Sequence, residues 1–196
     1  RAICMLPILL GQIGLPGTNT GQREAEPPVN LVGSIPSKNP VKTTIPVYQW
    51  VNAVDHGHEM TATNAGIMGA EKLQSDFKFI WNYAGNCLTN QHDDINHTHD
   101  ILVDESKCEF ILVWDTDSAK YADILLPDAM RSEQLNMYNQ GYSEWYTGVT
   151  VGGPAQEAPG ECRSSYDVCA DIADKFGKKD EFTEGRTHDD WVKYLY

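Results

Sequence analysis

Two short apolar segments near the middle of the chain, with a helical pattern between them, carry the clearest signal. Residues 77–83 read Phe-Lys-Phe-Ile-Trp-Asn-Tyr, a run of aromatic side chains that favours a β-strand. Residues 109–114 read Glu-Phe-Ile-Leu-Val-Trp, almost continuously apolar, as is typical of a strand buried on both faces. Between them, the apolar side chains of residues 90–104 recur at the three- and four-residue spacing of a helix. The pattern predicts a parallel strand, helix, strand (βαβ) unit.

A third strand is predicted at residues 122–126, where Ala-Asp-Ile-Leu-Leu is followed by Pro127, because proline cannot continue a strand ladder. We therefore expect a core unit over residues 77–128 within one domain fragment spanning 1–196. The fold class predicted is α/β: a Rossmann-like domain containing a parallel βαβ unit, with a long irregular arm.

The flanking segments predict helices and an extended arm. The arm covers residues 18–46, which hold five prolines and few periodic apolar positions. Residues 59–74 are expected to be a loop with at most one helical turn, and 132–153 an irregular stretch or a weak hairpin near 147–151. Helices are expected at 1–10, 48–56, from Ser164 or Ser165 to Gly177, and from Thr187 to the chain end.

Charge and composition exclude several classes of protein. The chain has 196 residues and a formal net charge of −13, so its long-range field repels phosphate backbones, and nucleic acid is a poor partner. Its longest apolar run, residues 2–10, is far shorter than the about 18 residues that a membrane span needs. The five cysteines form no Cys-x-x-Cys pair, which argues against a zinc or iron-sulfur site in this segment. The chain begins with Arg1 and no signal peptide follows, so we expect it to be part of a longer protein.

Polar residues follow the first two predicted strands and suggest a ligand site. Asn82, Gly85, Asn86 and Asn90 lie at the end of the first strand, and Asp115, Thr116, Asp117 and Ser118 at the end of the second. In open α/β sheets ligands bind beyond the carboxyl ends of strands, and amides and carboxylates suit a nucleoside. The same residue types are also ordinary turn and cap residues. A Gly-x-Gly-x-x-Gly fingerprint is absent, which disfavours a standard NAD site.

Four motifs resemble one family. They are GQIGLPGTNTG at 11–21, IWNYAGNCLTNQHDDINHTHDIL at 80–102, SAKYADILLPD at 118–128 and FTEGRTHDDWVKYLY at 182–196. All are similar to segments of molybdopterin oxidoreductases of the dimethyl sulfoxide reductase family, in particular its anaerobic membrane-linked catalytic subunits.

The resemblance implies a bis-(molybdopterin guanine dinucleotide) molybdenum cofactor and reduction of an S-oxide or N-oxide. It implies that Asn86 and Asn90 border one guanine nucleotide, and that Trp114 and Asp115 border its base or ribose. No residue here matches a catalytic or metal-ligating position, since the iron-sulfur cysteines and the molybdenum ligand are expected upstream. The loop between Asp115 and Ser118 is shorter than in the family, which puts the phosphate contacts in question.

The resemblance also implies partners and a location: an iron-sulfur electron-transfer subunit, a membrane anchor and the bacterial periplasm. One alternative is a non-catalytic α/β nucleotide-binding or interaction module derived from that family, which the short loop between Asp115 and Ser118 favours. A second is a flavodoxin-like electron carrier. A metal site on the face carrying His92, His97 and His99 is a weaker alternative, because the ligand spacing of four is missing. Cys87, at a turn before a helix, is the cysteine most worth testing for reactivity.

Overall fold

The computed structural model describes residues 2–18, 39–91, 94–114, 117–139 and 148–196. Its centre is a parallel sheet with strand order β1-β2-β3, formed by β1 (Phe79–Tyr83), β2 (Phe110–Trp114) and β3 (Ile124–Leu125). All three strands lie within the segments predicted from sequence, and both pairings are parallel. The predicted α/β class and the βαβ unit are confirmed.

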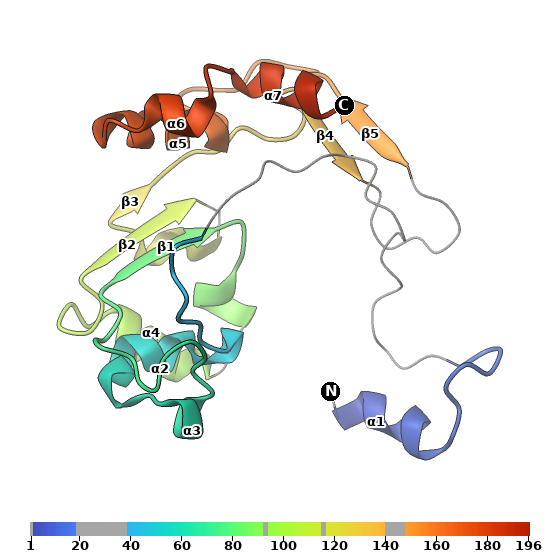
Figure 1. Cartoon of the computed structure of the whole chain (residues 1–196), viewed down its shortest axis with the longest axis vertical. Helices are drawn as coiled ribbons and strands as arrows, with labels where there is room; N and C mark the ends of the chain where they lie inside the picture. The colour runs from blue at the N-terminus through green and yellow to red at the C-terminus, as the bar shows by residue number, and fades with distance from the viewer. Residues whose placement is uncertain (1, 19–38, 92–93, 115–116, 140–147) are drawn as a thin grey trace.

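One face of the sheet is covered by α2 (Trp50–His56) and α4 (Ile95–Leu102), as Figure 1 shows. These two helices turn their apolar side chains toward β2, since residues three or four apart share a helix face. The resulting core contains Val51, Val54, Leu88, Ile101, Leu102, Cys108, Ile111 and Val113. A neighbouring cluster of Ala53, Met60, Ile67 and Leu73 packs beneath α2, around the short helix α3 (Ala62–Ala65). The single helical turn expected within 59–74 is therefore present.

An ion pair fastens α2 to the loop that leads into β2. The ammonium of Lys107 lies 2.7 Å from a carboxylate oxygen of Asp55 and also donates to the Asp55 backbone carbonyl at 3.1 Å. The hydrogen bond from Lys107 is the main reason why the pKa of Asp55 lies below its ordinary value. The contact connects residues 52 positions apart in sequence.

The prediction of a helix over residues 90–104 is wrong for the residues before Ile95. The chain instead forms a short π-helix at Cys87–Gln91, and α4 begins only at Ile95. The reason is Asp94, whose carboxylate accepts from the backbone N–H groups of Asn96 at 3.0 Å and His97 at 3.2 Å. A side chain that caps a helix in this way fixes where the helix starts.

The remaining elements follow the predicted order with some differences. The described helices and strands outside the core are α1 (Ala2–Leu9), β4 (Asn136–Asn139), β5 (Val149–Gly152), α5 (Ser165–Lys175), α6 (Lys179–Thr183) and α7 (His188–Leu195). The weak hairpin expected near 147–151 is present as an antiparallel β4-β5 pair, but its first strand, β4, lies before the predicted residues 147–151. Helix α6 was not predicted. Of the arm expected at 18–46, residues 19–38 lie outside the described part.

The second face of the sheet has a thinner cover. Helices α5 and α6 lie on the side of the sheet opposite α2 and α4 (Figure 1), yet Phe110 of β2 stays 37% exposed. The expectation that β2 is buried on both faces therefore holds for the side of Ile111 and Val113 and fails at Phe110. No helix in the described part of the chain is long and apolar enough to cross a bilayer.

Candidate functional site

The carboxyl ends of β1 and β2 meet at one edge of the sheet. Tyr83 is paired in register with Trp114, and the N–H of Ala84 donates to the carbonyl of Trp114 at 3.3 Å. Ala84 has a φ of +51°, which turns the chain sharply out of the strand. The polar residues that follow both strands thus start from the same edge, where ligands bind in open α/β sheets.

Asn82 holds the turn after β1 and is not itself presented to a ligand. Its side chain is 4% exposed; its amide N–H donates to the carbonyl of Gly85 at 2.8 Å and its amide oxygen accepts from the thiol of Cys87 at 2.9 Å. The polar atoms of Asn82 are therefore used to shape the turn. The same bond gives Cys87 a structural role, since its thiol is engaged as a donor.

Asn86 and Asn90 are brought together by the π-helix. The carbonyl of Asn86 accepts from the N–H groups of Thr89 at 3.1 Å and Asn90 at 3.0 Å, which places the two asparagines one helical turn apart. Asn86 is half-buried and Asn90 is exposed. Short π-helical turns occur frequently at functional sites, and two amides at this spacing offer both donors and acceptors to one ligand.

The start of α4 offers little to a phosphate group. The first free N–H groups of a helix attract anions, but here Asp94 already accepts from two of them. The start of α4 therefore leaves fewer backbone N–H groups available to a phosphate. Lys120, in the short helix that follows β2, lies with its ammonium 4.6 Å from the centre of the Tyr121 ring.

Trp114 projects from the face opposite the α4 side. Its neighbour in sequence, Val113, points into the core, so the Trp114 ring lies on the other face, where it stacks on Trp81 with centroids 6.2 Å apart and meets the edge of Tyr83 at 5.5 Å. The ring is 2% exposed. Within the described part of the chain its indole N–H has no hydrogen-bond acceptor. Asp115, the fourth predicted residue, lies outside the described residues.

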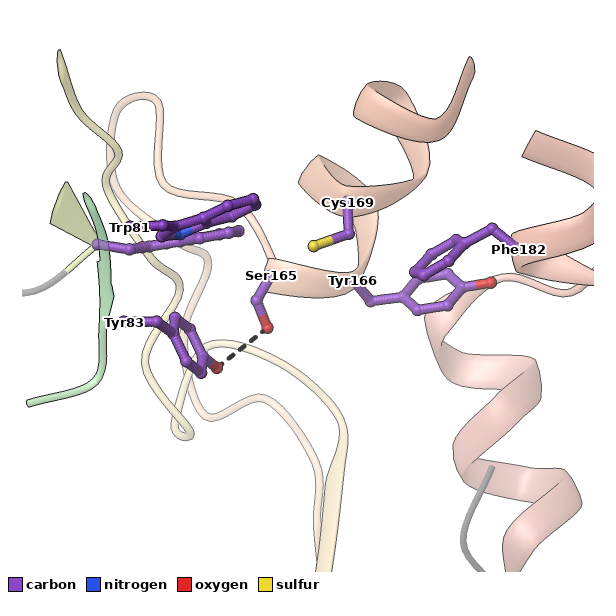
Figure 2. Close-up of a pocket in the computed structure, with 7 residues that line it drawn as sticks. Trp81, Tyr83, Ser165, Tyr166, Cys169 and Phe182 are labelled. Atoms are coloured by element: carbon purple, nitrogen blue, oxygen red, sulfur yellow. Dashed lines mark hydrogen bonds between the residues drawn. The ribbon is translucent and has the colours of Figure 1, made fainter. Parts of the chain in front are cut away.

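A hollow of about 480 Å³ lies beside Trp114, between the sheet and helices α5 and α6. Figure 2 shows Trp81 and Tyr83 on one side and Ser165, Tyr166, Cys169 and Phe182 on the other. The hydroxyls of Tyr83 and Ser165 are 3.4 Å apart, and burial raises the pKa of the Cys169 thiol, which disfavours the reactive thiolate. No sequence motif predicts this hollow, although the alternating aromatic residues at 79, 81 and 83 indicate an aromatic face on the strand.

The histidines of α4 take separate partners. His97 lies 3.8 Å from the Asp55 carboxylate, while a ring nitrogen of His99 lies 3.0 Å from the hydroxyl of Tyr121. His92 lies outside the described residues. Among the residues that are described, no group of three His, Cys, Asp or Glu side chains converges as metal ligands do.

The chain matches the sequence model of the molybdopterin oxidoreductase family over residues 1–175. It therefore belongs to the molybdopterin oxidoreductases. Within that family its similarity is to dimethyl sulfoxide reductases: it is 47% identical to dimethyl sulfoxide reductase DmsA of Haemophilus influenzae, over 100% of this chain and 25% of that protein.

Two further relatives show the range of that similarity. DmsA of Escherichia coli K12 is 43% identical, over 100% of this chain and 24% of the relative. The dimethyl sulfoxide/trimethylamine N-oxide reductase of Rhodobacter capsulatus is 29% identical, over 97% of this chain and 25% of the relative. The chain thus spans about a quarter of the length of the curated relatives it matches.

The described residues fit part of the cofactor that the family implies. The amides of Asn86 and Asn90 suit the donor and acceptor edge of a purine nucleoside. The phosphates are served less well, since Asp94 caps α4 and Lys120 lies over Tyr121. The polar groups of this segment therefore suit a nucleoside better than a phosphate.

Proposed function

We propose that this chain contributes to binding the guanine nucleotide end of a molybdopterin cofactor in the catalytic subunit of an S-oxide or N-oxide reductase. The observation that carries the proposal is the pair Asn86 and Asn90, one turn apart at the carboxyl edge of a parallel sheet. Membership of the molybdopterin oxidoreductases implies a pterin cofactor. When bound, this cofactor would supply two-electron oxygen-atom transfer.

In this proposal Asn86 and Asn90 hydrogen-bond the nucleoside, and the turn held by Asn82 sets their spacing. The backbone carbonyl of Trp114 accepts from Ala84 and so joins the ends of β1 and β2. The ring of Trp114 packs against Trp81 on the opposite face of the sheet. Asp115 is proposed as the acceptor for the base or ribose, because a carboxylate after a strand accepts well from sugar hydroxyls and from a guanine edge.

The test uses the complete enzyme with Asn90→Ala, Asn86→Ala and the double variant. Each lost hydrogen bond is worth about 1 kcal/mol, so each single variant should retain cofactor about fivefold less tightly. The measurements are molybdenum by mass spectrometry and guanine released on acid hydrolysis. The matched control is Asn96→Ala, an exposed asparagine on α4 and outside the π-helix. Equal molybdenum and guanine contents in the double variant and the control would refute the assignment.

The proposal extends to the setting of the whole protein. The relatives named dimethyl sulfoxide reductase suggest an S-oxide substrate, and we propose an iron-sulfur partner subunit, a membrane anchor subunit and a periplasmic location. Fractionation of cells that express the complete reading frame tests this. The protein should sediment with the membrane fraction, on its periplasmic side, and should move to the soluble periplasmic fraction when the partner genes are deleted. Its recovery in the cytosol with the partner genes intact would contradict the proposal.

A further inference from the structure

Three side chains that can carry a positive charge surround the carboxylate of Asp55, near the end of α2. The ammonium of Lys107 lies 2.7 Å from Oδ1 of Asp55. A ring nitrogen of His56 lies 3.2 Å from Oδ2, and Nε2 of His97 lies 3.8 Å from the same oxygen. Both oxygens of one carboxylate thus have basic neighbours. We call these four residues the Asp55 cluster.

The Asp55 cluster joins three segments of the scaffold. Asp55 and His56 belong to α2, His97 lies in the first turn of α4, and Lys107 lies between α4 and β2. Because His56 follows Asp55 directly in sequence, its contact stays within one helix. His97 and Lys107 are therefore the members that connect α2 to other segments.

The ion pair between Asp55 and Lys107 is the part of the cluster that stays charged. The hydrogen bond from Lys107 is the largest influence on the pKa of Asp55 and lowers it; burial acts against this, and the contact with His56 lowers the pKa further. The pKa of Lys107 is raised, chiefly by its hydrogen bond to Asp55. Both residues are thus charged over the range of about pH 5 to 8 in which histidine side chains ordinarily change their charge.

The contact between His97 and Asp55 depends on the charge of the imidazole. At 3.8 Å the two atoms are too far apart for a hydrogen bond, since such bonds span about 2.7–3.2 Å. A neutral imidazole therefore gains little from this carboxylate, whereas an imidazolium is attracted to it. A histidine that gains a carboxylate partner on folding stabilises the folded state below its unfolded-state pKa, and this stabilisation is lost as the pH rises.

We propose that His97 and Asp55 form an acid-strengthened clamp between α2 and α4. The clamp adds to the permanent ion pair of Lys107 as the pH falls through the histidine range. Since α4 follows the π-helix directly in the chain, the clamp steadies the helix next to Asn90 in mild acid. The inference rests on the contacts of the Asp55 cluster and is independent of the cofactor proposal.

Other charged groups act on the same cluster. Asp94, the residue that caps α4, accepts from the backbone N–H of His97 at 3.2 Å, so its carboxylate is the rival partner for a charged His97 ring. The carboxylates of Asp104 and Asp76 attract Lys107 electrostatically and raise its pKa further. The experiment therefore has to separate Asp55 from Asp94.

The test is hydrogen exchange, read by mass spectrometry, on the complete protein and its His97→Gln variant. At about pH 5.5 peptides from α4 should exchange about two- to fivefold faster in the variant, because an exposed ion pair shifts a local opening equilibrium by about this factor. At about pH 8 the two proteins should agree, because the imidazole is then neutral. The matched control is His188→Gln, which removes an imidazole 3.2 Å from Asp189 on α7 and should leave the α4 peptides unchanged at both pH values.

Two further variants identify the charge and the partner. Arginine stays charged at every pH used, so His97→Arg should protect the α4 peptides more than the unmodified protein does at about pH 8. In an Asp55→Asn background, His97→Gln should have no effect at either pH, as expected when the only partner of a charge has been removed.

Three results would overturn the proposal. No effect of His97→Gln at acid pH means that the clamp does not exist, and an equal effect at both pH values means that the contact does not depend on charge. An acid-specific effect that persists in the Asp55→Asn background identifies Asp94 as the partner. If Asp55→Asn does not fold, His97→Arg decides, since unchanged protection at about pH 8 would equally exclude the clamp.

Discussion

Replacing Asn82 by alanine should loosen the turn that positions the proposed nucleoside subsite. Asn82 is 4% exposed and makes two hydrogen bonds, to the Gly85 carbonyl and from the Cys87 thiol. A buried polar group that loses its partner costs about 1–3 kcal/mol. Because two contacts are lost together, we expect local opening of residues 82–91 to become easier by about 2–4 kcal/mol.

Hydrogen exchange read by mass spectrometry measures this directly. A change of 2–4 kcal/mol corresponds to about 30- to 1,000-fold faster exchange in peptides covering β1 and the π-helix. Peptides from α7 should be unchanged, because the hydrogen bond that its Trp191 makes in the described structure goes to Tyr166 and not to residues 82–91. Asn96→Ala serves again as the control. Less than a threefold change in the 82–91 peptides would refute the argument that Asn82 holds the turn.

Asn82→Asp sharpens the same test. An aspartate can still accept from the Cys87 thiol but, when ionised, faces the Gly85 carbonyl without a proton to donate. Burial raises the pKa of a carboxyl group, so the folded-state pKa of this variant should exceed its unfolded value. Its stability should then fall as the pH rises above the ordinary aspartate range. A variant equally stable at low and neutral pH would contradict this.

Three further predictions concern the scaffold. Lys107→Met removes the hydrogen-bond donor that lowers the pKa of Asp55. A carboxyl group with a lowered pKa stabilises the folded protein at pH values above its unfolded-state pKa, and this stabilisation is lost as the pH falls through its folded-state pKa. The variant should therefore be less stable than the unmodified protein at pH 7, with a smaller deficit in acid, and an unchanged denaturation midpoint at pH 7 would contradict this. Gly69→Ala should cost at least about 2 kcal/mol, because Gly69 has a φ of +76° and an added Cβ would strike the Lys42 backbone; thermal unfolding checks it, with Gly153→Ala, where nothing lies nearby, as control. Thr187→Ala removes the capping box of α7 and should cost about 1 kcal/mol, seen as faster exchange in residues 188–195 and refuted by equal exchange in both proteins.

The relation between sequence and structure differs between the strands and the segments that join them. The strands were predictable because aromatic and β-branched runs bounded by Gly85 and Pro127 leave few alternatives. The π-helix was not predictable from periodicity, because its start and the delayed start of α4 depend on Asp94 and on the burial of Leu88 in the core. The roles of the side chains at the strand ends could not be predicted either. Asn82 and Asn86 are the same residue type, and only the packing of the folded chain buries Asn82.

The sequence alone determined the α/β class, the positions of the three strands, the parallel βαβ unit, the family resemblance and the candidate residues Asn86, Asn90, Trp114 and Asp115. Those features depend on local periodicity and residue type, which are read along one chain. Only the tertiary structure decided which polar groups hold turns, that Trp114 faces away from the asparagines, and that Phe79 and Phe110 are exposed while Trp114 on the same sheet face is buried. These depend on strand register and on contacts between distant segments, which no local pattern encodes.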